Sequence, residues 1–269
     1  MSELDYVAWK SWREADFGKY SQREARYLKL ELGEYLRPGV RLLEIGFGNG
    51  SVLSWARDRG AIVAGVELEA DLLRRARNHG IEAHARLDAA LERAYDVVVA
   101  FDVLEHIPAA DVVSFLKTVR SRMAAGGVFI ARYPNGDSPL SMHVQYGDMT
   151  HGSPIGLGRI RQWSQMSHLN IEELRDPRFP TWYGNPVRSV VRFGKWALRK
   201  TLIRCLAWVC TGDFKHPFDA NSLLVMTNTP GHRVSAAWRS GRRPFALRRR
   251  RPVPSSDGER RADPTSVRD

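Results

Sequence analysis

Short apolar runs alternate with stretches of helical apolar spacing through the first half of the chain. The runs occupy residues 42–45, 62–66, 81–85, 95–100 and 128–131, and apolar residues recur every three or four positions between them. Strands without polar alternation are typical of parallel sheets covered by helices on both faces. The pattern therefore predicts an α/β fold with a doubly wound parallel sheet over 41–133, which binds its ligand at the carboxyl ends of the strands.

The segments that flank this core carry weaker patterns. Residues 1–38 are amphipathic and are predicted to be helical, with Pro38 and Gly39 ending the element. Within the core, Gly126 and Gly127 are expected to close a helix over 111–123 and to precede the strand at 128–131. Beyond the core we expect a helix over 159–168, a sixth strand within 171–187, a helix over 188–210 and an antiparallel last strand over 222–227.

The predicted helix over 188–210 has no acidic residue and many large apolar ones. Its cations recur at helical steps and form one basic stripe, made of Arg188, Arg192, Lys195 and Arg199. Two interpretations stay open. The first, which we favour, is a helix packed on the sheet or in a dimer. The second is a peripheral helix lying in a membrane interface.

A glycine-rich turn joins the first strand to a helical pattern that begins at Ser51. Residues 44–50 read Glu-Ile-Gly-Phe-Gly-Asn-Gly. Glycines let a ligand approach the backbone, and the helix start points its unpaired N–H groups toward that ligand. The spacing departs from the dinucleotide fingerprint, because Ser51 stands where the third glycine should be. Glu44 would repel a pyrophosphate and suits a ligand with an ammonium group, which points to S-adenosylmethionine (SAM). A plain helix-packing turn is the alternative.

Two motifs carry a resemblance to a known family. Residues 44–50 resemble motif I of the class I SAM-dependent methyltransferases, and residues 95–107 resemble motif IV of the subgroup typified by ubiquinone-biosynthesis enzymes. The resemblance covers most of 12–228 and implies a seven-stranded, Rossmann-like class I methyltransferase sheet. It implies an N-terminal helical lid over 1–40 and a SAM-binding core over 41–133. Residues 134–229 would complete the same domain with an acceptor loop, a C-terminal helical insertion and the last strand.

The resemblance also implies where SAM binds. Glu67 ends the second strand, where a carboxylate can accept hydrogen bonds from the ribose hydroxyls; a surface acid is the alternative. Asp88 would receive the adenine amino group, unless it only caps a helix. The backbone of Phe101 would face the methionine part. The expected cofactor-binding residues are Glu44, Gly46, Phe47, Gly48, Gly50, Glu67, Leu68, Asp88, Ala89, Phe101 and Asp102.

A long polar loop from Pro134 to about Ile155 is expected to select the acceptor. Its residues 146–151 resemble a Gly-Asp-Leu-Thr-His element of methyltransferases from bacterial surface-polysaccharide pathways. Methylation of a hydroxyl requires removal of its proton, for which a histidine of near-neutral pKa is suited. His151, oriented by Asp148, is the first candidate base and His106 the second.

Other roles for these side chains stay open. Asp148 and His151 could serve only to shape the loop, and His106 could be structural. Asp102, Asp148 and His151 lack a recognisable metal-ligand spacing, so no metal is predicted.

Charge is concentrated at the end of the chain. Residues 231–269 hold eleven arginines and four acids, which supplies +7 of the formal net charge of +11. The segment 230–269 is predicted to be a disordered basic tail, with anionic lipid, nucleic acid or no partner as its alternatives. The two cysteines form no disulfide framework, and neither a signal peptide nor a membrane-spanning run is visible. We therefore expect a cytoplasmic location, with the inner face of the membrane as a possible site of peripheral contact.

These observations favour an enzyme that uses SAM to O-methylate a sugar or cell-surface glycan precursor. A methyltransferase of a quinone or other small lipid-like molecule is the alternative. A protein that binds nucleic acid through its basic tail is a third possibility, which the absence of an Asn-Pro-Pro-Tyr motif and of a large basic face in the body disfavours. The sequence does not determine the oligomeric state.

Overall fold

The computed structural model describes residues 10–89, 94–180 and 186–229. Seven strands within these ranges form one sheet in the order β3-β2-β1-β4-β5-β7-β6. They are β1 (Arg41–Ile45), β2 (Ile62–Val66), β3 (Glu82–His84), β4 (Tyr95–Phe101), β5 (Met123–Pro134), β6 (Asn170–Arg175) and β7 (Asn221–Thr227). The first five strands are parallel, and β7 runs antiparallel to both β5 and β6. The predicted doubly wound sheet and its antiparallel last strand are therefore confirmed.

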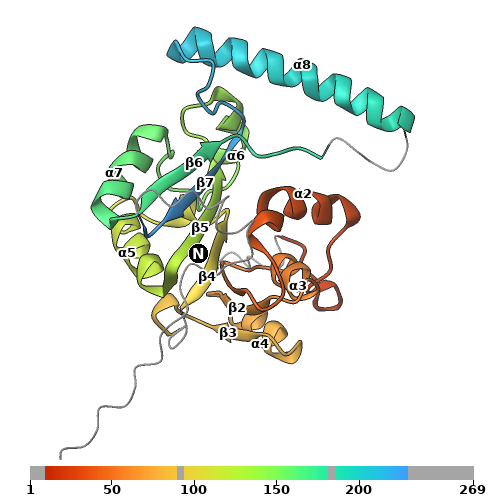
Figure 1. Cartoon of the computed structure of the whole chain (residues 1–269), viewed down its shortest axis with the longest axis vertical. Helices are drawn as coiled ribbons and strands as arrows, with labels where there is room; N and C mark the ends of the chain where they lie inside the picture. Colours follow the sequence, from red (N-terminus) through yellow and green to blue (C-terminus); the bar gives the residue numbers. More distant parts are fainter. Residues whose placement is uncertain (1–9, 90–93, 181–185, 230–269) are drawn as a thin grey trace, which may run out of the picture.

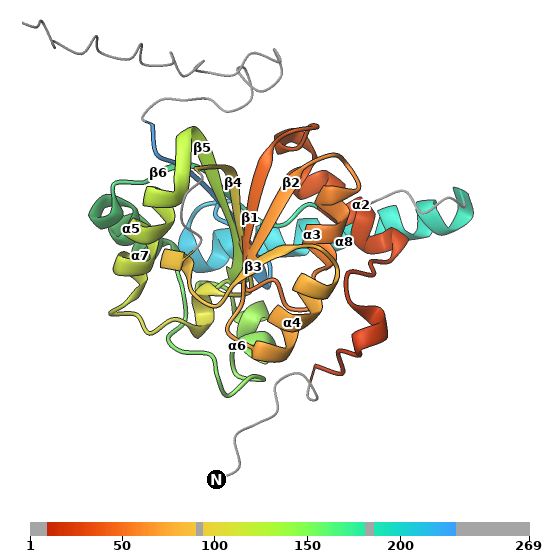
Figure 2. The same cartoon turned by 90° about the horizontal axis from the view of Figure 1, so that it is seen from below.

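Helices cover both faces of the sheet (Figures 1 and 2). One core lies under α2 (Gln22–Leu32), α3 (Ser51–Arg57) and α4 (Ala70–Asn78), where Trp55 and Leu28 are fully buried. The other lies under α5 (Val112–Arg122) and α7 (Leu157–Ser167). The remaining elements are α6 (Met142–Gln145), α8 (Pro186–Thr211) and the short 3-10 helices η1 (Glu14–Asp16), η2 (Gly33–Tyr35), η3 (Leu87–Ala89), η4 (Leu104–His106) and η5 (Pro139–Ser141).

Two boundaries differ from the prediction. In the described residues 10–38, the N-terminal segment is α-helical only over α2. This helix begins after Ser21, whose hydroxyl accepts a hydrogen bond from the Glu24 N–H at 3.1 Å. Residues 10–20 form turns and η1 instead, because Gly18 adopts a positive φ of 73° and breaks the helical pattern. Strand β5 begins at Met123, not after the two glycines, because Met123 pairs with Tyr95 across a register irregularity.

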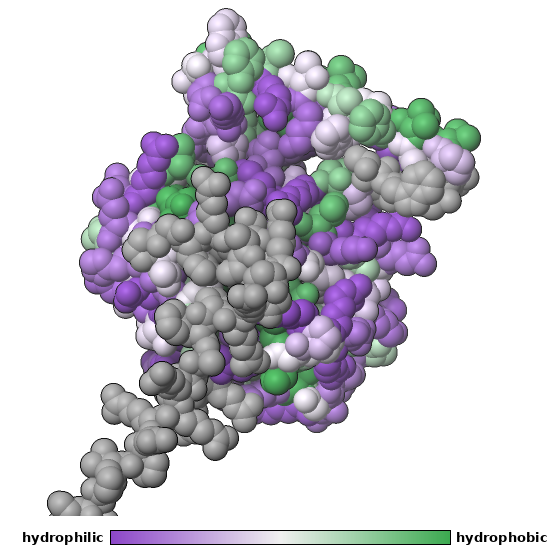
Figure 3. Space-filling view, viewed as in Figure 1, coloured by the Kyte–Doolittle hydropathy of each residue, from purple (hydrophilic) through white to green (hydrophobic). Residues whose placement is uncertain are grey.

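Helix α8 projects from the body instead of covering the sheet (Figure 1). The buried apolar side chains among its described residues, Ile203 and Ala207, pack against Phe218 and Leu140, which lie outside the strands. Much of its remaining surface is apolar and exposed, including Leu198 and Trp208, and hydrophobic patches lie along it in Figure 3. Of the two arrangements in the favoured interpretation, packing on the sheet is therefore wrong, and packing in a dimer stays a prediction. Within the described ranges, no helix combines the length and apolar character needed to cross a bilayer.

Candidate functional site

The glycine turn lies at the carboxyl end of β1 and leads into α3. Gly46, Gly48 and Gly50 all adopt positive φ, at 67°, 50° and 71°. A Cβ added at these positions would lie 2.6 to 2.7 Å from the side chains of Val103, Trp12 and Phe17. Both the backbone angles and the crowding therefore require glycine here. The turn leads into the start of α3, and Gly46 is exposed whereas Gly48 and Gly50 are buried. Its role in binding a ligand stays a prediction.

Glu44 is a buried carboxyl group with an unsatisfied oxygen. The residue is 4% exposed, and its Oε2 has no hydrogen-bond partner among the described residues. Burial raises the pKa of Glu44 well above its usual range, although a hydrogen bond with the Leu53 backbone opposes that shift. A buried carboxyl group with one unpaired oxygen fits the cationic amino group of a ligand. The site therefore suits the ammonium end of SAM better than a pyrophosphate.

Glu67 closes the turn from the end of β2. Its Oε2 accepts a hydrogen bond from the Gly48 N–H at 3.0 Å, and its Oε1 accepts one from the Leu68 N–H at 2.7 Å. This carboxylate therefore lies against the glycine turn, and its predicted role as the ribose acceptor stays a prediction. The Leu68 side chain beside it is 83% exposed, and an apolar side chain presented to solvent fits the face of an adenine ring.

Other predicted cofactor residues differ in what they offer. The side chain of Phe47 is buried in the core, and a Cβ on Gly65 would lie 2.4 Å from its Cδ1, so only the Phe47 backbone is available to a ligand. Asp88 lies in η3 after β3 and pairs with Arg86 at 3.0 Å. Ala89 ends a described range, and its side chain is not described.

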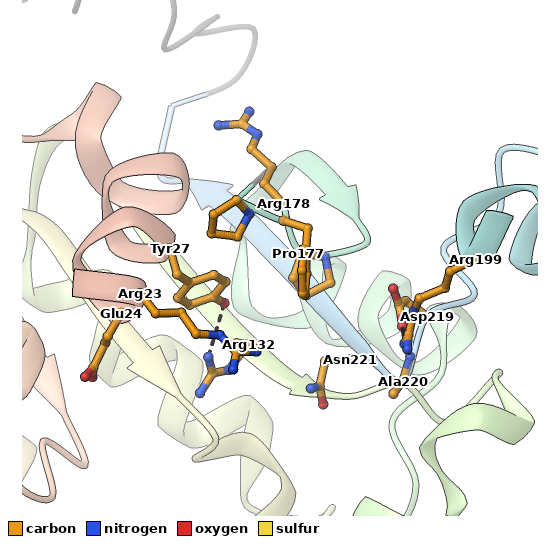
Figure 4. Close-up of a pocket in the computed structure, with 12 residues that line it drawn as sticks. Arg23, Glu24, Tyr27, Arg132, Pro177, Arg178, Arg199, Asp219, Ala220 and Asn221 are labelled. Atoms are coloured by element: carbon orange, nitrogen blue, oxygen red, sulfur yellow. Dashed lines mark hydrogen bonds and ion pairs between the residues drawn. The ribbon is translucent and has the colours of Figure 1, made fainter. Parts of the chain in front are cut away.

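Arg132 was not singled out by the sequence analysis. It lies in β5 and forms an ion pair with Asp102, with 2.9 Å between Nε and Oδ1. Its guanidinium lies over the Phe101 ring, 5.0 Å from the centroid, and donates a hydrogen bond to the Tyr27 hydroxyl at 3.2 Å (Figure 4). Asp102 itself has a strained φ of 56°. An arginine inside an otherwise apolar strand was the signal that could have found this contact.

Two loops meet at the same edge of the sheet. The Gly152 N–H donates to the Glu105 carbonyl at 2.7 Å and joins the loop after β4 to the loop after β5. The rings of His106 and His151 are 4.7 Å apart between centroids, in an edge-to-face arrangement. The structure thus brings together the two histidines that the sequence proposed as alternative bases.

A hydrogen-bond chain determines the tautomer of His106. The Thr150 hydroxyl donates to Asp148 Oδ1 at 2.6 Å, because a carboxylate can only accept. A hydroxyl has one proton, so Thr150 Oγ1 must accept the bond from His106 Nδ1, at 2.9 Å. Nδ1 therefore carries the proton, and Nε2 of the neutral ring keeps a lone pair. Burial lowers the pKa of His106, which favours this neutral form.

Asp148 supports this chain more directly than it supports His151. Burial opposes ionisation of Asp148, but hydrogen bonds from the Thr150 hydroxyl and N–H lower its pKa on balance. Its Oδ2 lies 3.8 Å from His151 Nε2, beyond hydrogen-bond distance. His151 Nδ1 instead donates to the Gln145 carbonyl at 3.2 Å. Asp148 therefore orients His106 through Thr150 and acts on His151 through its charge.

Glu105 adds a third donor that the sequence analysis missed, although it directly precedes His106. Glu105, His106 and His151, here called the donor cluster, each offer a ligand atom within 4.8 Å of the others. Burial raises the pKa of Glu105 to about 8. Imidazole and carboxylate donors so arranged could hold a divalent cation, which the sequence spacing did not predict.

A cavity of about 430 Å³ opens beside Arg132 (Figure 4). Its walls come from α2, β5, the segment after β6, α8 and the turn before β7, and they include Arg23, Tyr27, Arg178 and Asp219. The sequence analysis did not anticipate it, because its walls come from five separate segments.

Comparisons with known proteins agree with this geometry. Residues 17–176, more than half of the chain, match a family model described as a methyltransferase domain. The chain is 31% identical over 167 residues to the ubiquinone biosynthesis O-methyltransferase of Xanthomonas campestris pv. campestris, covering 54% of this chain and 69% of that protein. It is 24% identical over 173 residues to the Xylella fastidiosa protein of the same name, covering 54% and 66%. The chain thus spans about two thirds of the length of these curated relatives.

Solved structures resemble the fold as a whole. A SAM-dependent methyltransferase from Archaeoglobus fulgidus superposes with a TM-score of 0.54 at 15% identity, covering 82% of this chain and 99% of that one. A second from Clostridium acetobutylicum gives a TM-score of 0.53 at 12% identity, covering 82% and 96%. At these identities the likeness establishes the Rossmann-like class I methyltransferase fold, which the sequence resemblance predicted.

Proposed function

Because this chain belongs to the SAM-dependent methyltransferases, and is therefore an enzyme whose cofactor is SAM, we propose that it methylates a hydroxyl oxygen of a sugar or cell-surface glycan precursor. The hydrogen-bond chain from Asp148 through Thr150 to His106 carries this proposal. It leaves an unprotonated Nε2 for a hydroxyl proton. The charged cavity beside Arg132 supports a polar acceptor, since an apolar ring would call for aromatic walls with few polar groups.

In this proposal some residues of the chain hold the cofactor and others remove the proton from the acceptor hydroxyl. SAM, when bound, would supply an electrophilic methyl group, whose bond to sulfur would break as the bond to oxygen forms. Glu44 would hold the ammonium group and Glu67 the ribose, and most of the rate would come from aligning the acceptor oxygen with the methyl group. His106 Nε2 takes the hydroxyl proton, and Asp148 stabilises the resulting imidazolium through Thr150. His151, the first candidate base from the sequence, lies against His106 and is the second candidate here.

The donor cluster supports a second route for the same proton. A divalent cation held there would lower the pKa of a bound hydroxyl, and no neutral base would be needed. Chelation distinguishes the two routes. Turnover that survives exhaustive dialysis against EDTA supports His106 acting alone, whereas turnover lost on dialysis and restored by Mg²⁺ or Mn²⁺ supports the cation.

A second acceptor class is favoured by one specific observation. The curated relatives named above, one of them 31% identical, are ubiquinone biosynthesis O-methyltransferases, so a hydroxylated quinone is the alternative acceptor. The proposed membrane contact through 188–210 would suit such a lipid-like substrate. The nucleic-acid alternative concerns residues 230–269, which lie outside the described ranges.

The test is a transfer assay with methyl-labelled SAM. The acceptors are a panel of nucleotide sugars and glycans and a panel of hydroxylated quinols, and the matched control is Glu67→Gln, which removes the charge that faces the ribose site. We expect label in the first panel and none with the variant. Label found only in the quinols would replace the sugar acceptor with the quinone.

A further inference from the structure

The cavity beside Arg132 continues into a second cavity along α8. The two have volumes of about 430 and 260 Å³ and share Arg23, Pro177, Phe179, Arg199 and Asp219. We call the joined space the arginine groove. Figure 4 shows its first part, with Arg23 and Arg132 beside Tyr27 and with Arg199 beside Asp219. It lies at the carboxyl edge of β5, on the face of the sheet that α2 covers.

Positive charge predominates in the groove. Its cations are Arg23, Arg132, Arg178, Arg192, Lys195, Arg199 and Lys200, whereas its acids are Glu24 and Asp219. They come from α2, β5, the segment after β6 and α8, which are far apart in the sequence but converge on one space. Like charges brought together by the fold repel one another unless acids of the protein or a bound anion neutralise them.

Several of these cations are already paired, but two are not. The ion pairs join Arg132 to Asp102, Arg178 to Glu34, Arg199 to Asp219 and Lys200 to Asp176. In the parts of the chain that the structure describes, Arg23 and Lys195 have neither a hydrogen-bond nor an ion-pair partner. A bound anion would therefore find two uncompensated cations as well as paired guanidinium groups that have further donors to offer.

The groove borders the predicted methionine end of the cofactor site. Arg132 forms its wall and also touches Phe101 and Asp102. Glu24, on the same wall, accepts a hydrogen bond from the Ser51 hydroxyl at 2.6 Å, at the start of α3. An anion in the groove would thus lie beside a SAM molecule on the glycine turn, where an acceptor is expected.

The lining selects among anions. A guanidinium binds phosphate through two parallel hydrogen bonds, and several arginines from different directions match the several oxygens of a diphosphate. Phe179 and Trp196 add aromatic surface next to these charges. A group attached to the diphosphate could pack there.

We propose that the arginine groove binds the diphosphate of a phosphorylated acceptor and thereby presents the acceptor's hydroxyl to the methyl group. The inference rests on the proposed O-methyltransferase function and deepens it. A nucleoside diphosphate carrier and a prenyl diphosphate carrier share this chemistry, and both would place the diphosphate on the arginines and the attached group on the aromatic wall.

The test measures binding of inorganic pyrophosphate by calorimetry, with the full chain saturated with S-adenosylhomocysteine (SAH). Arg23→Gln and Arg199→Gln each remove one charge-assisted hydrogen-bond donor and should weaken pyrophosphate binding about tenfold. Arg161→Gln is the matched control, because Arg161 is an exposed arginine of α7 on the other face of the sheet. All three variants retain the arginine-rich tail, so a loss of pyrophosphate affinity in Arg23→Gln and Arg199→Gln alone shows that pyrophosphate binds in the groove. SAH affinity and melting temperature should be unchanged in each.

Separate outcomes address the groove and the enzyme. No pyrophosphate binding at millimolar concentration, or binding that both groove variants retain, overturns the groove while SAH binding leaves the methyltransferase standing. Failure to bind SAH overturns the cofactor assignment instead. Competition experiments with uridine diphosphate and with farnesyl diphosphate identify the carrier. If one of these two compounds binds more tightly than pyrophosphate, the result supports the proposal and shows which carrier the groove takes. If neither compound displaces pyrophosphate, the proposal is overturned.

Discussion

Binding of SAH should become tighter as pH rises, because Glu44 must lose a proton to receive the ligand's ammonium group. In the free protein, burial raises the pKa of this carboxyl and favours its protonated form. Its unpaired Oε2 is the atom that a cation would satisfy. Ligand binding would then stabilise the carboxylate and release one proton.

The magnitude follows from linkage. While pH is below the pKa of Glu44 in the free protein, release of one proton raises the association constant about tenfold per pH unit, or about 1.4 kcal/mol. Above that pKa the dependence should disappear. Glu44→Gln cannot release the proton, so its affinity for SAH should not rise with pH in this way. At high pH its binding free energy for SAH should be weaker than that of the wild type by about 1.5–3 kcal/mol, the usual contribution of a hydrogen bond to a charged group.

The assay is calorimetry with SAH between about pH 6 and about pH 8, in two buffers of different ionisation enthalpy so that the released proton is counted directly. The same group makes an opposite contribution to stability. Folding raises the pKa of Glu44, so the contribution of this group to stability is complete below its unfolded-state pKa of about 4.3 and is lost as pH rises through its folded-state pKa. The melting temperature of Glu44→Gln should therefore increase relative to that of the wild type as pH rises. A wild-type affinity independent of pH, with no proton release, would refute the assignment of Glu44.

Further predictions concern the base, the turn and the donor cluster. His106→Gln should lower kcat by about 10²- to 10⁴-fold in a transfer assay, with little change in SAH affinity. Thr150→Val should lower kcat and Thr150→Ser should retain it, because only the hydroxyl fixes the tautomer of His106. Equal rates for the two Thr150 variants would contradict this role of the hydroxyl. Gly65→Ala should destabilise the protein by about 1–3 kcal/mol in urea, because the new Cβ meets the Phe47 ring at 2.4 Å. Gly158→Ala, in α7 with open space around it, should cost nothing and is the control. If the donor cluster holds a cation, Zn²⁺ or Mn²⁺ should raise the melting temperature of EDTA-treated protein, and the increase should vanish in His151→Ala. A thermal-shift titration measures both, and no increase with the wild type supports His106 acting alone.

Much of the candidate site could be read from short stretches of sequence, because local sterics determine them. The glycine turn follows from backbone angles that only glycine adopts without strain, and the direction of β7 agrees with the predicted antiparallel last strand. The roles proposed for Glu44 and Glu67 also depended only on their place at strand ends. The length of the first helix was misjudged, because an amphipathic composition does not reveal where the chain turns back on the glycines.

What the sequence determined by itself was the order of strands and helices, the glycine turn that we propose receives SAM, and the histidines that could act as bases. Only the tertiary structure decided that Thr150 lies against His106 across 44 positions of chain, that Arg132 reaches Tyr27 across 105, and that cations from four segments share one groove. The physical reason is the distance along the chain over which each effect acts. Periodicity and turn sterics act over a few residues, whereas these partners meet only after the sheet has brought the ends of its strands to one edge.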